Sequence, residues 1–359
     1  MNGRSESGRV LYINAQPGCD LKSEYGHFPE KPACDTKQAY DQAKLEKRRY
    51  LRAIGEDVYP MDSPVSDGAI TMIGTPTKKY PKISMRAGTR TMKINGTGVL
   101  TLDGLTIDMA ATRSVMLTCS ATELGATPAV NIIESRIFGG LSITTTDYSG
   151  YLFSLTGCDF RMVRNVIGIE TVDEANILNR VLSNGNILYV GSTLSGFQGV
   201  FENNLVAGNF GTIMNLVQSP GANVKVRFNT FVYNSLGVNN TQSPIYCPIG
   251  RDNLKWDFTN NIFFGNKLAN GSSFDSPAFC KLAGSTVDSK DTITNPDVRK
   301  IDPVFENTFE LKNDPVNFQC CIDQASVDDG PTPPTVDLAG RSRPQNSKYD
   351  VGCFEYRPG

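Results

Sequence analysis

The sequence contains one histidine and one tryptophan among its 359 residues, and it lacks any long apolar run. The single imidazole, His27, and the absence of Cys-x-x-Cys spacing argue against a zinc site and against a histidine-based catalytic triad. No run of about 18 apolar residues is present, so no membrane-spanning helix is predicted. The 35 Lys and Arg against 37 Asp and Glu give a net charge of −2, which leaves no basic footprint for nucleic acid.

Most of the nine cysteines fall into three groups by their surroundings. The groups are Cys119, Cys158 and Cys247 in apolar segments, Cys19 and Cys34 at the ends of a loop-like stretch, and Cys320, Cys321 and Cys353 near the C-terminus. We interpret the first group as small buried hydrophobic residues. The second group could form a disulfide bond, and the third has room for one.

Between Val99 and Asn266 one unit recurs: a short apolar strand, a single turn residue and a second strand. The turn residues are Leu105, Ser135, Cys158, Asn179, Asn203, Asn229 and Asn260. They recur every 20–30 residues or so, which is typical of a solenoid. The units are rich in β-branched and aromatic residues that alternate with polar ones, so they predict strands and not helices.

A coil with three short strands is one rung of a parallel β-helix, in which each strand pairs with its counterpart about 4.8 Å away. The consecutive turn asparagines support this fold, because Asn tolerates the left-handed conformation and stacked amides bond to one another. We therefore predict an all-β, single-stranded, right-handed parallel β-helix of three sheets and about 8–10 coils. Its predicted structural ladder is Asn179, Asn203, Asn229 and Asn260.

The two ends of the chain are predicted to cap this solenoid. Residues 36–54 have the pattern of a helix, which we expect to cover the N-terminal rung. Its Lys47-Arg48-Arg49 run is interpreted as a solvated helix face, with a binding patch as the alternative. One structural domain is expected, with residues 1–59 as the N-terminal strand and helix, 60–282 as the coils and 283–359 as the C-terminal cap.

The C-terminal tail carries a series of short elements with a recognisable order. They are Asp302-Pro303-Val304-Phe305, Phe309-Glu310-Leu311, Cys321-Ile322-Asp323, Asp337-Leu338-Ala339-Gly340-Arg341 and Asp350-Val351-Gly352-Cys353-Phe354-Glu355-Tyr356. These resemble the "DP.F", "F.L...S..ID.G", "D..G..R" and "DIGAFEY" ending of right-handed β-helix proteins of the pectate-lyase-like superfamily. The coils resemble the "N.F..N" coils of the same proteins, many of which are surface or secreted proteins of Bacteroidetes. The resemblance spans roughly residues 60–359 and speaks for fold more than activity, because the superfamily includes lyases, hydrolases and adhesins.

The acidic and basic tail residues are given structural roles here. Asp350 and Arg341 are expected to make charge-assisted hydrogen bonds that fix the cap loops, and Glu355 is expected to do the same.

The resemblance implies that substrate lies along the sheet that begins each coil. We assign segments 114–120, 141–146, 166–171, 186–192, 212–217 and 243–250 to that sheet. A calcium-dependent lyase would need several carboxylates together there, and Glu170, Asp173, Glu174 and Asp147 are the candidates for Ca²⁺, the one cofactor left open. No repeated Asp pair suits a glycoside hydrolase.

Two other groups are candidates for sugar chemistry. Tyr246 as base and Arg251 as carboxylate clamp would suit elimination without metal, so Tyr246 and Arg251 are the catalytic candidates. Lys225, Arg227 and Lys255 fall on the second sheet of adjacent coils and are candidates for binding an acidic sugar. Solvent-facing strand residues remain the alternative for both groups.

The sequence thus favours a secreted or cell-surface protein that binds a polysaccharide, with or without lyase activity on an acidic glycan. The alternatives are a non-catalytic surface scaffold or adhesin and, more weakly, a phage tailspike-like depolymerase, which would require a trimer. We expect a monomer at the surface of, or outside, a Gram-negative bacterium. No leader is visible at Met1, and the native gene product is expected to carry one that this sequence lacks.

Overall fold

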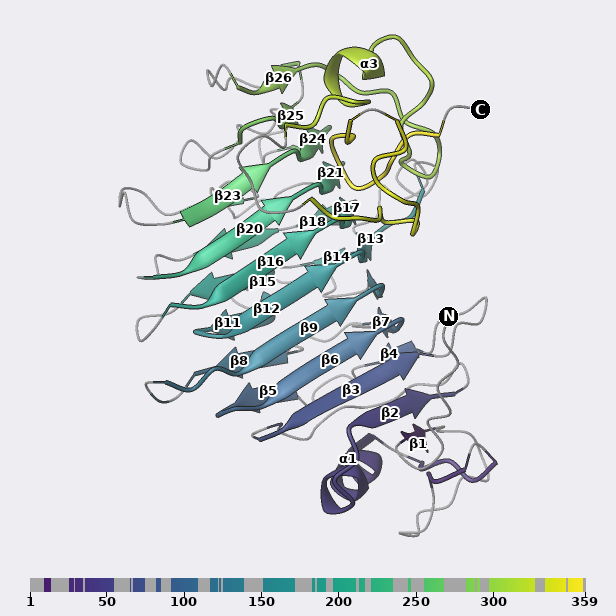
Figure 1. The fold of residues 1–359 in the computed structure, drawn as a ribbon, viewed down its shortest axis with the longest axis vertical. Helices are drawn as coiled ribbons and strands as arrows, with labels where there is room; N and C mark the ends of the chain where they lie inside the picture. The colour runs from purple at the N-terminus through teal and green to yellow at the C-terminus, as the bar shows by residue number, and fades with distance from the viewer. Residues whose placement is uncertain are drawn as a thin grey trace.

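The computed structural model describes most of the coils and both caps (Figure 1). The described residues are 10–13, 26–28, 30–34, 36–54, 65, 67–74, 82–84, 92–108, 117–121, 123, 125–138, 151–171, 183–184, 186–191, 196–210, 213–216, 221–234, 245–246, 255–267, 282–287, 289–290, 297–326, 333–346 and 348–357.

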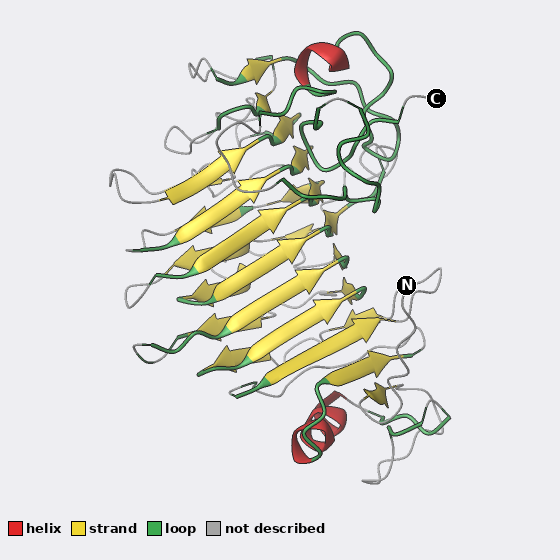
Figure 2. Cartoon of the chain, in the orientation of Figure 1, coloured by secondary structure: helices red, strands yellow, loops and turns green. Residues whose placement is uncertain are grey.

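Three all-parallel sheets form a solenoid, as the sequence predicts, so this protein is a parallel β-helix (Figure 2). The sheet that faces the viewer, sheet A, contains nine strands: β1 (Val10–Ile13), β2 (Tyr50–Ala53), β3 (Ala69–Gly74), β6 (Val99–Asp103), β9 (Ala129–Ile133), β12 (Asp159–Val163), β16 (Gln198–Glu202), β20 (Asn223–Arg227) and β23 (Lys255–Thr259). Each strand pairs in parallel with the next, because every coil presents the same alternation of buried and outward residues to its neighbour.

The second strand of each coil belongs to sheet B, which also has nine strands. These are β4 (Lys82–Ser84), β7 (Thr106–Asp108), β10 (Arg136–Phe138), β13 (Val166–Gly168), β17 (Leu205–Ala207), β21 (Thr230–Val232), β24 (Ile262–Phe264), β25 (Thr286–Val287) and β26 (Arg299–Lys300). Sheet C, which comes before sheet A in each coil, has β5 (Met92–Asn95), β8 (Leu117–Ser120), β11 (Tyr151–Thr156), β15 (Asn186–Gly191), β19 (Met214–Leu216) and β22 (Ile245–Tyr246). A short pair, β14 (Ser183–Asn184) with β18 (Asn209–Phe210), completes the strands among the described residues.

The interior is a continuous apolar column of inward-facing side chains. Along β6, for example, Leu100 and Leu102 are fully buried while their neighbours lie on the outer side. Aromatic rings stack from coil to coil, as Phe231 does on Phe263 with centroids 4.9 Å apart. Because the side-chain period of a strand is two, this alternation also fixes which residues face outward.

The turn from sheet A to sheet B holds a buried asparagine ladder. The stacked residues are Ser135, Asn165, Asn204, Asn229, Asn261 and Ser285. In its centre the Asn204 Nδ2 donates to the Asn229 Oδ1 at 3.1 Å, and the Asn229 Nδ2 donates to the Asn261 Oδ1 at 3.0 Å. The second hydrogen of each amide goes to a main-chain carbonyl, so the buried polar groups satisfy one another.

A second ladder follows sheet B and was not predicted from the sequence. It consists of Asn209, Asn234 and Asn266, joined amide to amide at 3.0 Å and 2.9 Å. In both ladders the residue before the asparagine has a positive φ, for example +55° at Phe228 and +54° at Tyr233. The left-handed residue turns the chain, and the next residue directs its amide inward.

The predicted ladder is corrected at two positions. Asn229 stands in the ladder, but Asn203 and Asn260 occupy the left-handed positions, with φ of +54° and +56°. Their side chains turn outward and bond to the C-terminal segment, at Val336 and Ser326. Asn179 lies outside the described residues.

The predicted turn at Cys158 is also wrong, because this residue joins sheet C to sheet A. The register of that coil therefore shifts by one strand: residues 166–168 belong to β13 in sheet B, not to the first sheet of the coil. Cys119 and Cys158 are buried as predicted, and they also form a disulfide bond between adjacent coils. Cys34 is disulfide-bonded, and its expected partner Cys19 lies outside the described residues.

The N-terminal helix α1 (Thr36–Leu45) is shorter than the predicted 36–54. Its buried face, Ala39, Tyr40 and Ala43, packs against β1 and β2. The chain after it becomes β2, because Tyr50–Ala53 alternates between outward and buried side chains and fits between β1 and β3. Sheet A therefore begins within the N-terminal segment.

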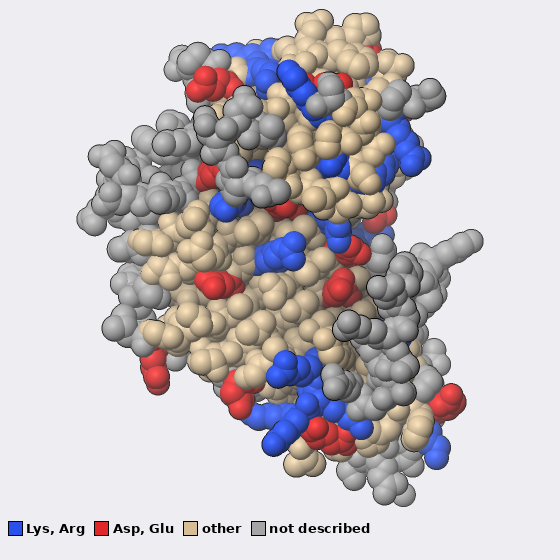
Figure 3. Space-filling model, viewed as in Figure 1, with Lys and Arg blue, Asp and Glu red and all other residues tan. Residues whose placement is uncertain are grey.

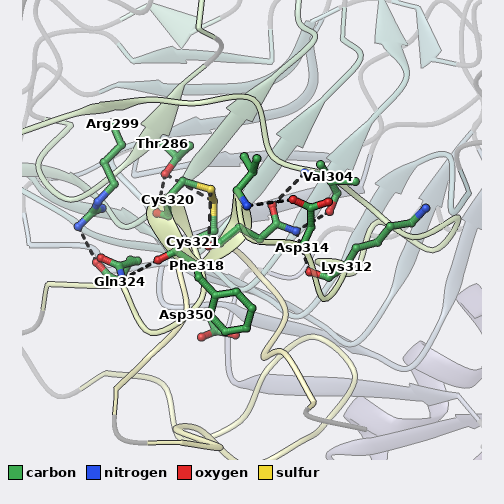
Figure 4. The surroundings of a disulfide bond; sticks show 12 residues. Thr286, Arg299, Val304, Lys312, Asp314, Phe318, Cys320, Cys321, Gln324 and Asp350 are labelled. Carbon is green, nitrogen blue, oxygen red and sulfur yellow. Dashed lines mark hydrogen bonds between the residues drawn. A yellow bond between two sulfur atoms is a disulfide. The ribbon is translucent and has the colours of Figure 1, made fainter.

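The C-terminal segment, residues 301–357, returns along the turns between sheets A and B instead of covering only the last rung (Figure 1). Its short helix α3 (Asn317–Cys320) lies against β25 and ends in a disulfide bond between the adjacent Cys320 and Cys321 (Figure 4). The Thr286 hydroxyl donates to the Cys320 carbonyl at 3.0 Å, which ties this helix to the last coils.

Charged tail residues hold the segment together, in keeping with their expected structural role. The Asp350 Oδ1 accepts from the Asp323 amide at 2.7 Å, and the Arg341 Nη1 donates to the Glu355 carbonyl at 3.0 Å. The fully buried Arg343 guanidinium lies 3.2 Å from a Glu355 oxygen.

Candidate functional site

The outer face of sheet A is a regular surface formed by nine strands, and it faces the viewer in Figure 3. Its central row contains one outward residue from each of seven strands: Thr71, Thr101, Asn131, Arg161, Val200, Lys225 and Asp257. We call this set the middle row. Neighbouring members are about 4.8 Å apart along the solenoid, since each strand is paired in register with the next.

Most side chains of the middle row are polar. The Asn131 Nδ2 donates to the Thr101 hydroxyl at 3.1 Å, which sets the orientation of that amide. Arg161 is exposed, and its neighbours in the row are Asn131 and Val200, neither of which carries a charge. Lys225 lies two strands from Arg161, about 10 Å away, and is in register with Asp257.

The row beside the middle row is buried on strands β12, β16 and β20. Val163, Glu202 and Arg227 are each less than 10% exposed. The Arg227 Nε donates to the Glu202 Oε2 at 2.6 Å, so this guanidinium is committed to a buried ion pair. Arg227 is therefore buried and paired with Glu202, although the sequence places it on the same face as Lys225.

The predicted sugar-binding trio is thus only partly brought together. Lys225 and Lys255 lie on adjacent strands of sheet A, where Lys255 is in register with Asn223. They occupy different rows, because Lys225 is in register with Asp257. The side chain of Lys255 lies outside the described residues.

A pocket of about 260 Å³ lies beside the turn from sheet A to sheet B, and residues 338–340 of the C-terminal segment form one of its walls. We call it the edge pocket; its lining includes Glu134, Arg136, Arg164, Glu170 and Gly340. Arg164 bonds to Glu134, and the Arg136 Nε lies 3.0 Å from a Glu170 oxygen. The pocket therefore offers two Arg–Glu pairs, whereas a Ca²⁺ site uses carboxylates directed at the ion.

Asp103 adds a perturbed carboxyl group near the edge pocket. Burial raises the pKa of Asp103 above its usual value, and the positive charge of Arg164 works in the opposite direction. Asp103 belongs to the same row as Ile133 and Val163, on the side of sheet A that borders the pocket.

Of the predicted metal and catalytic residues, the structure describes Glu170 and the main chain of Tyr246. Glu170 follows β13 in sheet B, because of the register shift, and does not lie on the sheet that begins each coil. Tyr246 does lie in that sheet, in β22 in register with Asn215, and its side chain is outside the described part. Asp147, Asp173, Glu174 and Arg251 are also outside the described residues, so calcium binding and elimination chemistry stay predictions.

The described part of the chain contains no group of three or more His, Cys, Asp and Glu side chains placed to hold a metal ion. Among the same residues, no helix is both long enough and apolar enough to cross a membrane.

Arg161 is the surface residue that sequence reasoning missed. Its signal was present, because Asp159-Phe160-Arg161-Met162 alternates between outward and buried positions. Finding it required the register of the neighbouring coils, which shows that Arg161 and Lys225 share one row.

Comparison with known proteins gives little guidance. No family model and no curated protein matches the sequence. One similar solved structure is tailspike protein 3 of bacteriophage CBA120, which is 14% identical, with 74% of this chain and 56% of that chain covered and a TM-score of 0.24. The match spans little more than half of the tailspike chain, so the fold described above rests on the sheets of this protein alone.

Proposed function

We propose that this protein binds an extended polysaccharide along the outer face of sheet A. The observation that carries the proposal is the middle row, where side chains with hydrogen-bonding groups stand in register on an open face of parallel strands. A polymer that crosses the strands meets such a side chain roughly every 4.8 Å, except at Val200. Many weak contacts repeated along a chain give useful total affinity without a deep pocket.

The cations of the middle row favour an acidic polymer. The Arg161 guanidinium has planar donors that suit a carboxylate or sulfate group, and it has uncharged neighbours in its row. Lys225 provides a second positive charge two strands away, next to Asp257. Surface charges of both signs are scattered over this face (Figure 3). Recognition would therefore depend on the distance between individual cations more than on the net electrostatic potential of the face.

The disulfide bonds support a location outside the cytosol. Cys119 is bonded to Cys158, and Cys320 is bonded to Cys321. Such bonds form and persist in oxidising compartments. We accordingly place the protein at a cell surface or in the extracellular medium.

Binding is better supported than cleavage by the described residues. The edge pocket holds carboxylates that are paired with guanidinium groups, and the middle row contains no pair of acids suited to hydrolysis. Lyase chemistry at Tyr246 and Arg251 remains a separate hypothesis. A purely structural scaffold is the competing function, and it predicts no dependence of binding on the middle row.

The test measures binding to three purified polymers: an uncharged glucan, polygalacturonate and a sulfated glycan. Arg161→Ala and Lys225→Ala are compared with Lys312→Ala, which removes an exposed cation from the C-terminal segment. We expect each middle-row variant to weaken binding to an acidic polymer about tenfold, the worth of one charge-assisted hydrogen bond, while Lys312→Ala has no effect. Equal binding by all variants, or binding to no polymer, would contradict the proposal.

A parallel assay separates binding from cleavage. Ultraviolet absorbance reports the unsaturated uronate that a lyase releases from polygalacturonate, with and without Ca²⁺. A rise that Arg251→Ala abolishes would add elimination chemistry to the binding function. No rise with any polymer would leave binding alone.

A further inference from the structure

A second concave surface lies at the N-terminal end of the sheet A face. It is a cleft of about 310 Å³ between the end of α1 and the start of β3. Four cations line it, Lys44, Lys47, Arg48 and Arg49, against the single carboxylate of Asp67. We call it the basic cleft; Figure 3 shows Lys and Arg side chains gathered at the α1 end of this face.

Two of the four cations are engaged within the protein. The Lys44 ammonium lies 2.7 Å from an Asp67 oxygen, and this hydrogen bond raises the pKa of Lys44. Arg48 bonds to Glu46 and donates to the Val10 carbonyl at 3.2 Å. Lys44 and Arg48 therefore already have partners within the protein.

The other two cations are available to a ligand. Lys47 and Arg49 are exposed, and neither makes an ion pair within the described residues. The basic cleft therefore has an excess of positive charge at its mouth. A guanidinium and an ammonium placed together suit an oxyanion, the former through two parallel hydrogen bonds and the latter as a point charge.

The main chain at Lys47 has a left-handed conformation. Lys47 has φ of +56° and ends α1, with the Arg48 amide donating to the Ala43 carbonyl at 2.8 Å and the Lys47 amide to the Lys44 carbonyl at 3.2 Å. This is a Schellman C-cap, whose left-handed position normally takes glycine. A side chain there costs on the order of 1 kcal/mol, as it does at other left-handed residues of this chain such as Arg164 and Phe228.

The basic cleft is also continuous with the sheet A face. Ala69 and Ile70 of β3 line the cleft. Ala69 is in register with Val99, and Val99 with Ala129, so small uncharged side chains lead from the cleft along the edge of the face. A polymer held at the cleft can extend over the following coils without meeting a charged side chain in that row before Asp159.

We propose that the basic cleft binds the carboxylate or sulfate group of an acidic polysaccharide, with Lys47 and Arg49 as its ligands. This inference rests on the proposed function and deepens it, because it names the acidic group as the feature recognised. It also gives the polymer a fixed starting point at the N-terminal end of the solenoid. The competing explanation is that Lys44 and Lys47 merely complement the negative end of the α1 dipole.

The first test uses inorganic sulfate, and acetate as the carboxylate probe, so that it does not depend on any polymer. Binding is followed by chemical-shift changes at the amides of 44–49 and 67–70. We expect Lys47→Gly to abolish the sulfate response while the melting temperature stays level or rises, because glycine relieves the left-handed strain. Arg49→Ala, which leaves the main-chain bond from Thr71 to the Arg49 carbonyl intact, should act in the same direction.

The second test compares Lys47→Gly with Lys312→Ala in binding to polygalacturonate and to a sulfated glycan. The proposal is supported if Lys47→Gly lowers the affinity for at least one polymer tenfold or more while Lys312→Ala does not. The polymer whose affinity falls identifies the acidic group that is bound. An unchanged sulfate response in both Lys47→Gly and Arg49→Ala overturns it, even if the middle-row variants lose polymer binding. Conversely, loss of the sulfate response in a protein that binds no polymer would retain the anion cleft and discard the proposed function. Equal binding to duplex DNA would overturn the glycan assignment, because it would mark a non-specific basic patch.

Discussion

The two ends of the solenoid contain similar charged residues in opposite environments. At the C-terminal end, Arg343 and Glu355 have side chains that are 0% and 1% exposed, and both bond to main-chain groups of the same segment. At the N-terminal end, the side chains of the Lys44–Asp67 pair are 53% and 63% exposed. Burial makes the first set part of the fold, because an unpaired buried charge is costly, and exposure leaves the second set free to exchange partners.

The largest expected effect comes from breaking the buried end. Arg343→Met removes the guanidinium from Glu355 and from the carbonyls of Asp350 and Gly352. We expect a loss of about 3–5 kcal/mol in the free energy of unfolding, because Glu355 is left buried without its cation. Chemical denaturation measures it, and a loss below about 1 kcal/mol would show that water reaches Glu355.

The asparagine ladder should give the next largest effect. Asn229→Ala deletes an amide that bonds to both Asn204 and Asn261 and to the Phe201 carbonyl. Several buried groups lose their partner, so we expect a loss of about 3 kcal/mol. Asn203→Ala is the comparison variant, since this outward side chain makes one bond to Val336. Its loss should be smaller, about 1–2 kcal/mol, and part of it comes from placing alanine at a left-handed φ of +54°. Similar losses for the two variants would contradict the ladder.

The C-terminal end should also make stability depend on pH. Burial, reinforced by the charge of Glu355, raises the pKa of Asp350 from 3.8 to about 7, and burial also raises the pKa of Glu355. The folded state therefore holds protons that the unfolded state releases. This contribution is complete below pH 4 or so and is lost as the pH rises to about 7; the shift of Asp350 alone corresponds to about 4 kcal/mol.

Denaturation titrations at several pH values between 4 and 8 check the sign. The profile of Asp350→Asn should be flatter than that of the wild type, whatever its overall stability. A wild-type protein that becomes more stable over the same interval would contradict the assigned direction.

The smallest effect is expected at the exposed end. Lys44→Ala breaks the bond to Asp67, yet both groups are solvated before and after the change. We expect a change in the free energy of unfolding that is too small to resolve by the chemical denaturation used for Arg343→Met. A large loss would show that α1 depends on this ion pair and would weaken the contrast between the two ends.

The period of the coils was predictable from the sequence, whereas the residue at each turn was only partly so. Leu105, Ser135 and Asn229 were placed at the turn from sheet A to sheet B. At Asn203-Asn204 and Asn260-Asn261 the sequence offers two asparagines in succession, and the strand pattern alone does not say which is left-handed. Phe228 shows that the left-handed position does not require asparagine at all.

Errors in the candidate site followed from one such ambiguity. In this coil the sequence has two places where a strand, a turn and a second strand follow one another, one at Cys158 and one at Arg164. Only the pairing with neighbouring coils shows which of the two is the turn from sheet A to sheet B. Because the turn was assigned to Cys158, Glu170 was predicted on the wrong sheet. The ladder residue Asn165, whose Oδ1 accepts from the Ser135 amide at 2.9 Å, was not predicted. The Lys47-Arg48-Arg49 run was identified in the sequence with a binding patch as the alternative interpretation. The cleft that these residues line could not be predicted, because Lys47 and Ala69 meet only after β2 and β3 pair.

The return of the C-terminal segment has a consequence for how the chain folds. In a simple solenoid each repeat contacts only its neighbours, so folding can spread from any coil and stop at any other. Here Asn203 bonds to Val336 across 133 residues of sequence, and Asn260 bonds to Ser326 across 66. The coils from β16 to β24 therefore cannot complete their contacts until the last part of the chain has been synthesised. We expect the N-terminal coils to form during translation and the upper coils to become stable together, in a single late step.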